Sequence, residues 1–222
     1  MKNAKKIVMG GVAALALVTA SVMGTMAYFT SKTETVNNTF TVGKVKITLD
    51  ETKTNDLGEF VKKTGEKDES GNDIYTIVSK NEADRTMSNE YKMIPGKTYQ
   101  KDPTITVADK SEDSYLFVKV EDELAGVEGE VTVNKQILVN WTPVDGEEGV
   151  YYYGKNNSMT VVHANDKVTL FNTVTINPSA TKEDLKAVNG KTIKVTAYAV
   201  QAEGIDSVAT AWKAAKEANT ND

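Results

Sequence analysis

Short runs of β-forming residues, each closed by turn residues, recur along most of this 222-residue chain. The clearest run is residues 191–201, and Val45, Ile47 and Leu49 show the same alternation with polar neighbours. Alternation with a period of two is typical of a strand with one buried face. Roughly ten such runs predict a mainly β fold, specifically an antiparallel β-sandwich of the jelly-roll type.

Two short helices are expected beside these strands. Thr181 and Asp184 have the spacing of a capping box, and Asn189 followed by Gly190 ends that segment. Near the C-terminus, apolar residues at helical spacing form one stripe, which we expect to dock on the domain itself: Ile205, Val208, Ala209, Trp212 and Ala215. No internal repeat is apparent, so residues 28–222 are interpreted as a single β-sandwich domain.

The remaining runs differ in how buried their strands should be. Residues 114–120 are more apolar than alternation requires, which favours a central strand covered on both faces. Residues 131–133, 137–141 and 159–162 are interpreted as further strands.

The stretch of residues 50–73 is polar, with a short edge strand expected at residues 59–61. Residues 68–73 resemble a calcium loop in composition, but Asp73 stands at the sixth place, where that pattern needs glycine. We interpret these residues as the tip of a hairpin, and calcium binding by the acidic loops stays open.

The N-terminus has the three-part layout of a secretory signal peptide. A basic start is followed by an apolar run at residues 7–18 and then by small residues: Ala20, Ser21, Gly24, Thr25 and Ala27. Signal peptidases accept small side chains one and three places before the cut. We therefore expect residues 1–27 to be the signal, with cleavage between Ala27 and Tyr28. Cleavage after Ala20 and retention as a membrane anchor are the alternatives.

Charge and composition exclude several functional classes. Residues 1–27 hold three lysines and no acidic residue. Subtracting those lysines from the 26 basic residues leaves 23 against 31 acidic residues, a net charge of −8. Nucleic acids and anionic membranes select basic surfaces, so neither is an expected partner of the mature chain.

The amino-acid composition also argues against a catalytic role. The chain has no cysteine, and His163 is its one histidine. This composition leaves no His-x-x-x-His zinc site and no thiolate ligand. We expect no cofactor, no metal site and no enzymatic activity, and we interpret His163 as a surface or turn residue.

The N-terminal strand is the candidate for function. A strand at the start of a mature chain has one covalent connection, so it can leave its own sheet and pair with another subunit. Donor-strand addition of this kind links copies head to tail into filaments. We expect residues 28–49 to hold the donor segment, with Val36, Phe40 and Val42 as its assembly residues. The alternative is that the strand stays in its own sheet.

Three N-terminal motifs carry a resemblance to a known family. They are Gly-Thr-Met-Ala-Tyr-Phe-Thr-Ser at residues 24–31, Asn-Thr-Phe-Thr-Val-Gly at residues 38–43 and Val-Lys-Ile-Thr-Leu at residues 45–49. Together they resemble the TasA/camelysin group of exported Gram-positive proteins, which the SipW-type signal peptidase cleaves. The resemblance implies a jelly-roll-like sandwich, secretion to the cell surface or biofilm matrix, and fibres built from N-terminal donor strands.

Two functional hypotheses therefore remain, with a third as a minority alternative. The first is a secreted matrix subunit whose partners are its own copies or other matrix proteins, with the signal peptidase acting during export. The second is a monomeric surface-binding module that shares only the export signal. Some members of the group are labelled metallo-endopeptidases, but this chain has no His-Glu-x-x-His motif to support that activity.

Overall fold

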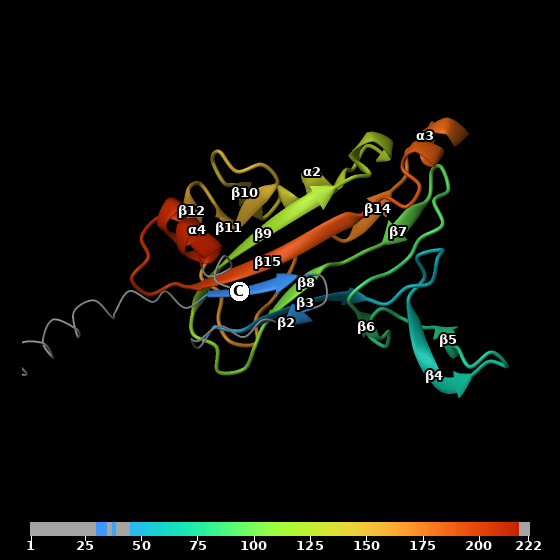
Figure 1. Ribbon diagram of the computed structural model, residues 1–222, viewed down its shortest axis with the longest axis horizontal. Coiled ribbons are helices and arrows are strands. Elements are labelled where there is room, and N and C mark those ends of the chain that lie inside the picture. Colours follow the sequence, from blue (N-terminus) through green and yellow to red (C-terminus); the bar gives the residue numbers. More distant parts are fainter. Residues whose placement is uncertain (1–29, 35–36, 39–44, 218–222) are drawn as a thin grey trace, which may run out of the picture.

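The computed structural model describes residues 30–34, 37–38 and 45–217, which form two facing antiparallel sheets with helices at their margins (Figure 1). The larger sheet has the strand order β10-β11-β9-β15-β1-β2, and β12 pairs with β11. Its strands are β1 (Thr30–Glu34), β2 (Asn37–Asn38), β9 (Ser114–Asp122), β10 (Trp141–Pro143), β11 (Val150–Lys155), β12 (Ser158–Met159) and β15 (Ile193–Gln201).

The second sheet has the order β13-β8-β3-β6. Its strands are β3 (Ile47–Thr52), β6 (Arg85–Thr86), β8 (Thr104–Val107) and β13 (Lys167–Thr169). Two further antiparallel pairs extend the molecule: β7 (Thr98–Gln100) with β14 (Thr173–Thr175), and β4 (Val61–Lys67) with β5 (Asp73–Ile77). The prediction of a mainly β, antiparallel sandwich is confirmed.

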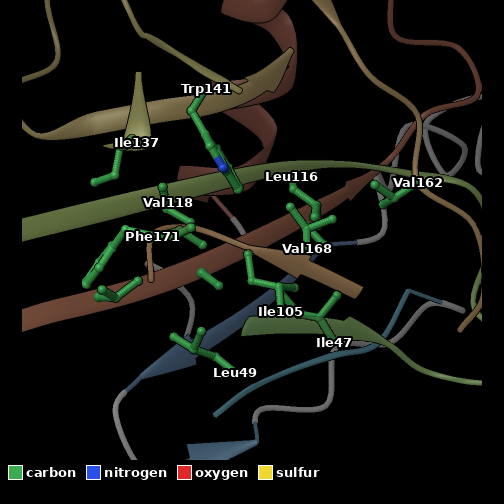
Figure 2. Packing of buried hydrophobic residues seen from close by; sticks show 14 of the residues in the cluster. Ile47, Leu49, Ile105, Leu116, Val118, Ile137, Trp141, Val162, Val168 and Phe171 are labelled. Atoms are coloured by element: carbon green, nitrogen blue, oxygen red, sulfur yellow. The ribbon is translucent and has the colours of Figure 1, made fainter. Parts of the chain in front are cut away.

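The main core lies between the two sheets (Figure 2). Ile47 and Leu49 of β3 and Ile105 of β8 point toward Leu116 and Val118 of β9. Each of these five side chains is buried, as period-two alternation on β3 and β8 requires. Contact between the two inner faces is what holds a sandwich together, because that is where its apolar side chains leave water.

A second core covers the opposite face of the larger sheet. Helix α4 (Val208–Glu217) lays Trp212 against Phe117 and Tyr198, with ring centroids 5.4 Å and 5.2 Å apart. The predicted docking of the C-terminal stripe is therefore confirmed. Strand β9 is buried on both faces, since Leu116 faces the sandwich while Phe117 faces the helix, and this too was predicted.

Helix α3 (Lys182–Ala187) begins as expected. The Thr181 hydroxyl accepts a hydrogen bond from the Asp184 backbone N–H, and the Asp184 carboxylate accepts one from the Thr181 backbone N–H. These reciprocal bonds satisfy two backbone donors that a helix start leaves unpaired. Earlier in the chain, a single turn of 3-10 helix, η1 (Ala125–Val127), follows β9.

The strands expected at residues 131–133 and 137–141 are wrong. Helix α2 (Val133–Ile137) occupies the middle of this stretch, with Thr132 as its N-cap, and β10 begins only at Trp141. Val133 and Ile137 lie four residues apart, so one helical face buries both of them in the main core. That burial outweighs the β-propensity of the two side chains. The structure thus has three α-helices among its described residues, where two were expected.

The polar stretch that follows β3 forms a projecting hairpin (Figure 1). The short edge strand expected near residue 60 is the longer β4. At the tip, the Asp68 carboxylate accepts hydrogen bonds from the backbone N–H groups of Ser70 and Asn72, both at 2.8 Å. This Asx-type turn confirms the hairpin tip.

The strand expected at residues 159–162 is shorter than predicted. Of residues 159–162, only Met159 belongs to a strand, and Val162 forms a single bridge with Ser114.

Within the described residues, no helix combines the length and apolar character needed to cross a lipid bilayer.

Candidate functional site

The sequence-predicted site residues fall largely outside the described part of the chain. Ala27 and Tyr28 of the expected cleavage site lie there, as do Val36, Phe40 and Val42 of the expected assembly strand. What the structure describes of that segment is the backbone of β1 and β2, and these two strands show where the N-terminal segment meets the sandwich.

Strand β1 pairs with one half of β15. The register runs from Thr30 opposite Val200 to Thr33 opposite Ala197. Strand β15 has nine residues, and β9 pairs with all nine on its other side. Among the described residues, Ile193–Thr196 therefore have a strand partner on the β9 side alone. In the part of the chain that the structure describes, the N-terminal half of β15 is an open sheet edge.

The hydrogen-bond pattern identifies the backbone groups at this open edge. The Glu123 backbone N–H donates to the Thr192 carbonyl, so the opposed residues Asp122 and Ile193 are a non-hydrogen-bonded pair. In an antiparallel ladder such pairs alternate with hydrogen-bonded ones. The N–H and C=O groups of Ile193 and Val195 therefore point away from β9, toward the open edge.

A groove of about 540 Å³ runs beside this edge. Ile193 and Val195 form one wall, and Leu49 and Glu51 of β3 contribute to the other. Much of its lining is apolar, contributed by strands and by the segment between β6 and β7: Leu49, Met87, Met93, Tyr99, Val174 and Ile176. An open strand edge next to an apolar groove is the arrangement that binds an extended peptide by β-augmentation, because the edge supplies hydrogen bonds and the groove receives alternate side chains.

A polar cluster lies in the same groove. The Glu51 carboxylate accepts a hydrogen bond from Lys101 Nζ at 2.6 Å through Oε2 and from Asn89 Nδ2 at 3.0 Å through Oε1. The Tyr91 hydroxyl donates to the Gln100 carbonyl at 2.8 Å. Burial, with the nearby Glu51 charge, raises the pKa of the Tyr91 hydroxyl. Tyr91 therefore stays neutral at physiological pH and acts as a hydrogen-bond donor.

A second buried carboxylate fastens the neighbouring segment to β3. Asp102 accepts hydrogen bonds from the backbone and side chain of Thr52, and it pairs with Lys80 at 2.8 Å and with Arg85 at 3.6 Å. Burial acts to raise the pKa of Asp102, but Lys80 and Thr52 outweigh it and hold that pKa below its usual value. The charged carboxylate thus ties residues 80–102 to one wall of the groove.

The single histidine lies elsewhere and is exposed. His163 Nδ1 is 2.7 Å from Asp113 Oδ1, and this contact raises the pKa of the imidazole. Over the described residues, no three His, Cys, Asp or Glu side chains gather in a way that could hold a metal ion. His163 is accordingly part of a surface ion pair, as expected for a turn residue.

No family model, curated protein or solved structure matches the chain. The groove was not anticipated from the sequence, because its lining comes from six segments that are distant along the chain. The spacing of Met87, Tyr91 and Met93 within one polar stretch was a usable signal, since large apolar residues in such a stretch often line a binding surface.

Proposed function

We propose that this protein is a secreted structural subunit of an extracellular matrix, joined to its own copies by addition of an N-terminal strand. The observation that carries the proposal is the half-covered β15 edge beside an apolar groove. The signal-like N-terminus and the resemblance to the TasA/camelysin group support secretion and the matrix role. The acidic net charge supports protein partners over nucleic acid.

The register of β1 indicates how a second copy would bind. Continued past Glu34 in the same antiparallel register, a donor strand places Val36 opposite Lys194 and residue 37 opposite Ile193. Thr35 and Asn37 of the donor would then face the outward backbone groups of Val195 and Ile193. Main-chain hydrogen bonds supply affinity in such a contact, and the groove selects the donor side chains.

This contact joins unlike surfaces of two identical subunits, a strand on one and a groove on the other. A heterologous contact that does not close into a ring builds an open filament. The proposed function is therefore a homopolymer, in which each copy donates one strand and receives another.

The test compares three proteins: the wild-type chain from Tyr28, a version that lacks residues 28–40, and Ile193→Pro in the chain from Tyr28. Proline at residue 193 removes an outward N–H and leaves the β9 ladder intact, because that N–H does not point toward β9. We expect filaments from the wild type alone, measured by light scattering and electron microscopy at high protein concentration.

Ile193→Ala is the matched control, because it keeps the backbone donor, and it should still assemble. Circular dichroism and thermal melts check that each variant is folded. Filaments from a folded Ile193→Pro protein at wild-type concentrations would rule out the β15 edge as the acceptor. Monomers from every version would leave the surface-binding module as the remaining hypothesis.

A further inference from the structure

Three side chains with complementary chemistry meet in the groove. Lys101 follows β7, Asn89 lies between β6 and β7, and Glu51 belongs to β3. One carboxylate holds the other two groups, since Glu51 Oε2 contacts Lys101 Nζ at 2.6 Å and Glu51 Oε1 contacts Asn89 Nδ2 at 3.0 Å. The Glu51 side chain is 5% exposed and that of Lys101 is 14% exposed. An amine, an amide and a proton acceptor are thus collected where little water reaches.

The Asn89 amide is also polarised at its carbonyl oxygen, Oδ1. The Thr54 backbone N–H donates to Asn89 Oδ1 at 2.9 Å, and Asn89 Nδ2 donates a second hydrogen bond to the Thr52 carbonyl, also at 2.9 Å. A fixed N–H aimed at a carbonyl oxygen stabilises the negative charge that develops there when a nucleophile attacks the carbon. The same contacts fix the orientation of the amide on the wall formed by β3.

We propose that Lys101 and Asn89 become joined by an intramolecular isopeptide bond, with Glu51 as the proton carrier. Glu51 takes a proton from the Lys101 ammonium, and the Nζ lone pair then attacks Asn89 Cγ. The Nζ–Cγ bond forms, and the Thr54 N–H stabilises the oxyanion at Oδ1.

The second half of the reaction releases ammonia. Glu51 passes its proton to Asn89 Nδ2, and the Cγ–Nδ2 bond then breaks to release ammonia. The Glu51 carboxylate takes a second proton from Lys101 Nζ. It passes this proton to the ammonia, which leaves as ammonium. The balance is one lysine ammonium and one asparagine amide converted to one secondary amide and one ammonium ion. No oxidant and no external co-reactant is required.

The surroundings favour this reaction over a permanent ion pair. Nucleophilic attack needs Nζ within about 3–3.5 Å of the amide carbon, and the flexible lysine stem can supply that movement while both groups stay on one carboxylate. The rings of Tyr91 and Tyr99, 5.4 Å apart, line the same groove. They limit the access of water, which would otherwise compete as a nucleophile.

Such a bond would cross-link the folded chain covalently, as a disulfide does in other exported proteins. The chain has no cysteine. An Asn89–Lys101 link closes the loop that contains β7, and it locks the segment that forms one side of the groove. This inference does not depend on filament formation, because it concerns a single copy of the chain.

The test is the intact mass of the purified protein, measured beside fragmentation of its proteolytic peptides. We expect a mass one ammonia molecule below that calculated from the sequence, and a branched peptide that joins residue 89 to residue 101. Glu51→Gln, Asn89→Ala and Lys101→Met should each restore the full mass. Glu90→Gln changes an exposed carboxylate in the same groove and should keep the link.

Mass measurement of the wild type decides the proposal even if a variant fails to fold. A folded wild type with the full calculated mass would overturn it and leave a buried ion pair in its place. Loss of ammonia that persists in Lys101→Met would overturn it as well, because that result assigns the loss to a succinimide at Asn189-Gly190. Filaments without the link, or the link without filaments, separate this proposal from the proposed function.

Discussion

At the scale of single residues, Glu128 is the group whose ionisation opposes the fold. It is buried, and both of its carboxylate oxygens accept from the Val133 backbone N–H, at 3.2 Å and 3.1 Å. Burial, followed by the nearby Asp122 charge, raises the pKa of Glu128 to about 7. The carboxyl therefore stays protonated in the folded chain at pH values where the unfolded chain has released that proton.

This difference gives stability a defined dependence on pH. Below the unfolded pKa of about 4.3, Glu128 is protonated in both states and the fold keeps its full stability. As the pH rises toward 7, only the unfolded state loses the proton, so the free energy of unfolding falls by about 3–4 kcal/mol. Urea titrations at pH 4.5 and pH 8 should show this loss in the wild type and not in Glu128→Gln.

Glu130→Gln is the control for that comparison, because Glu130 is exposed two residues away. It should retain the wild-type dependence on pH. If the free energy of unfolding of Glu128→Gln falls with pH as steeply as that of the wild type, another group governs the pH dependence.

At the scale of elements, α4 is a cover for the second core. Trp212 is 6% exposed and lies between Phe117 and Tyr198. Trp212→Ala removes the largest side chain of this contact, and we expect the free energy of unfolding to fall by about 3–5 kcal/mol. Chemical denaturation monitored by circular dichroism measures the change. Lys213→Ala, on the exposed side of the helix, should change stability by less than about 0.5 kcal/mol.

The same scale shows which elements the sequence specifies. Strands β9 and β15 are evident because their alternation and apolar excess reflect burial on one or two faces. Helix α2 is not evident, because Val133 and Ile137 have β-propensity and only the main core reveals that they share a helical face. The α3 capping box is local, so its residues were sufficient to predict it.

The candidate site was less predictable than the fold for a physical reason. Lys101, Asn89 and Glu51 are brought together by long-range pairing, and no local pattern records that they meet. The open half of β15 was hidden in the same way. Among the described residues, the pairing of β1 ends at Thr33, whereas β15 continues toward Ile193.

At the scale of the whole molecule, the β4–β5 hairpin is an appendage to the sandwich. Its side chains beyond Val61 are almost all exposed, and its internal ion pair joins Lys63 to Asp73 at 2.6 Å in solvent. Exposed pairs of this kind contribute little. Replacing residues 64–74 with a short glycine-serine turn should change the free energy of unfolding by less than about 1 kcal/mol.

Thermal unfolding of the shortened protein beside the wild type measures that change. Cooperative unfolding at a similar temperature is the expected result. A large loss of stability would mean that the hairpin belongs to the folding unit of the sandwich.

The pairing of β9 with β15 also fixes when the chain can fold. Residues 114–122 have their principal partner at residues 193–201, and α4 closes the second core from residues still further along. A chain that emerges from a ribosome with its N-terminus first can pair β9 with β11 early, but the other edge of β9 lacks its β15 partner until nearly the whole length is free. Such non-local pairing folds slowly, because a long loop must close before contacts repay its entropy. The topology thus delays completion of the larger sheet and of the second core until the last helix is released.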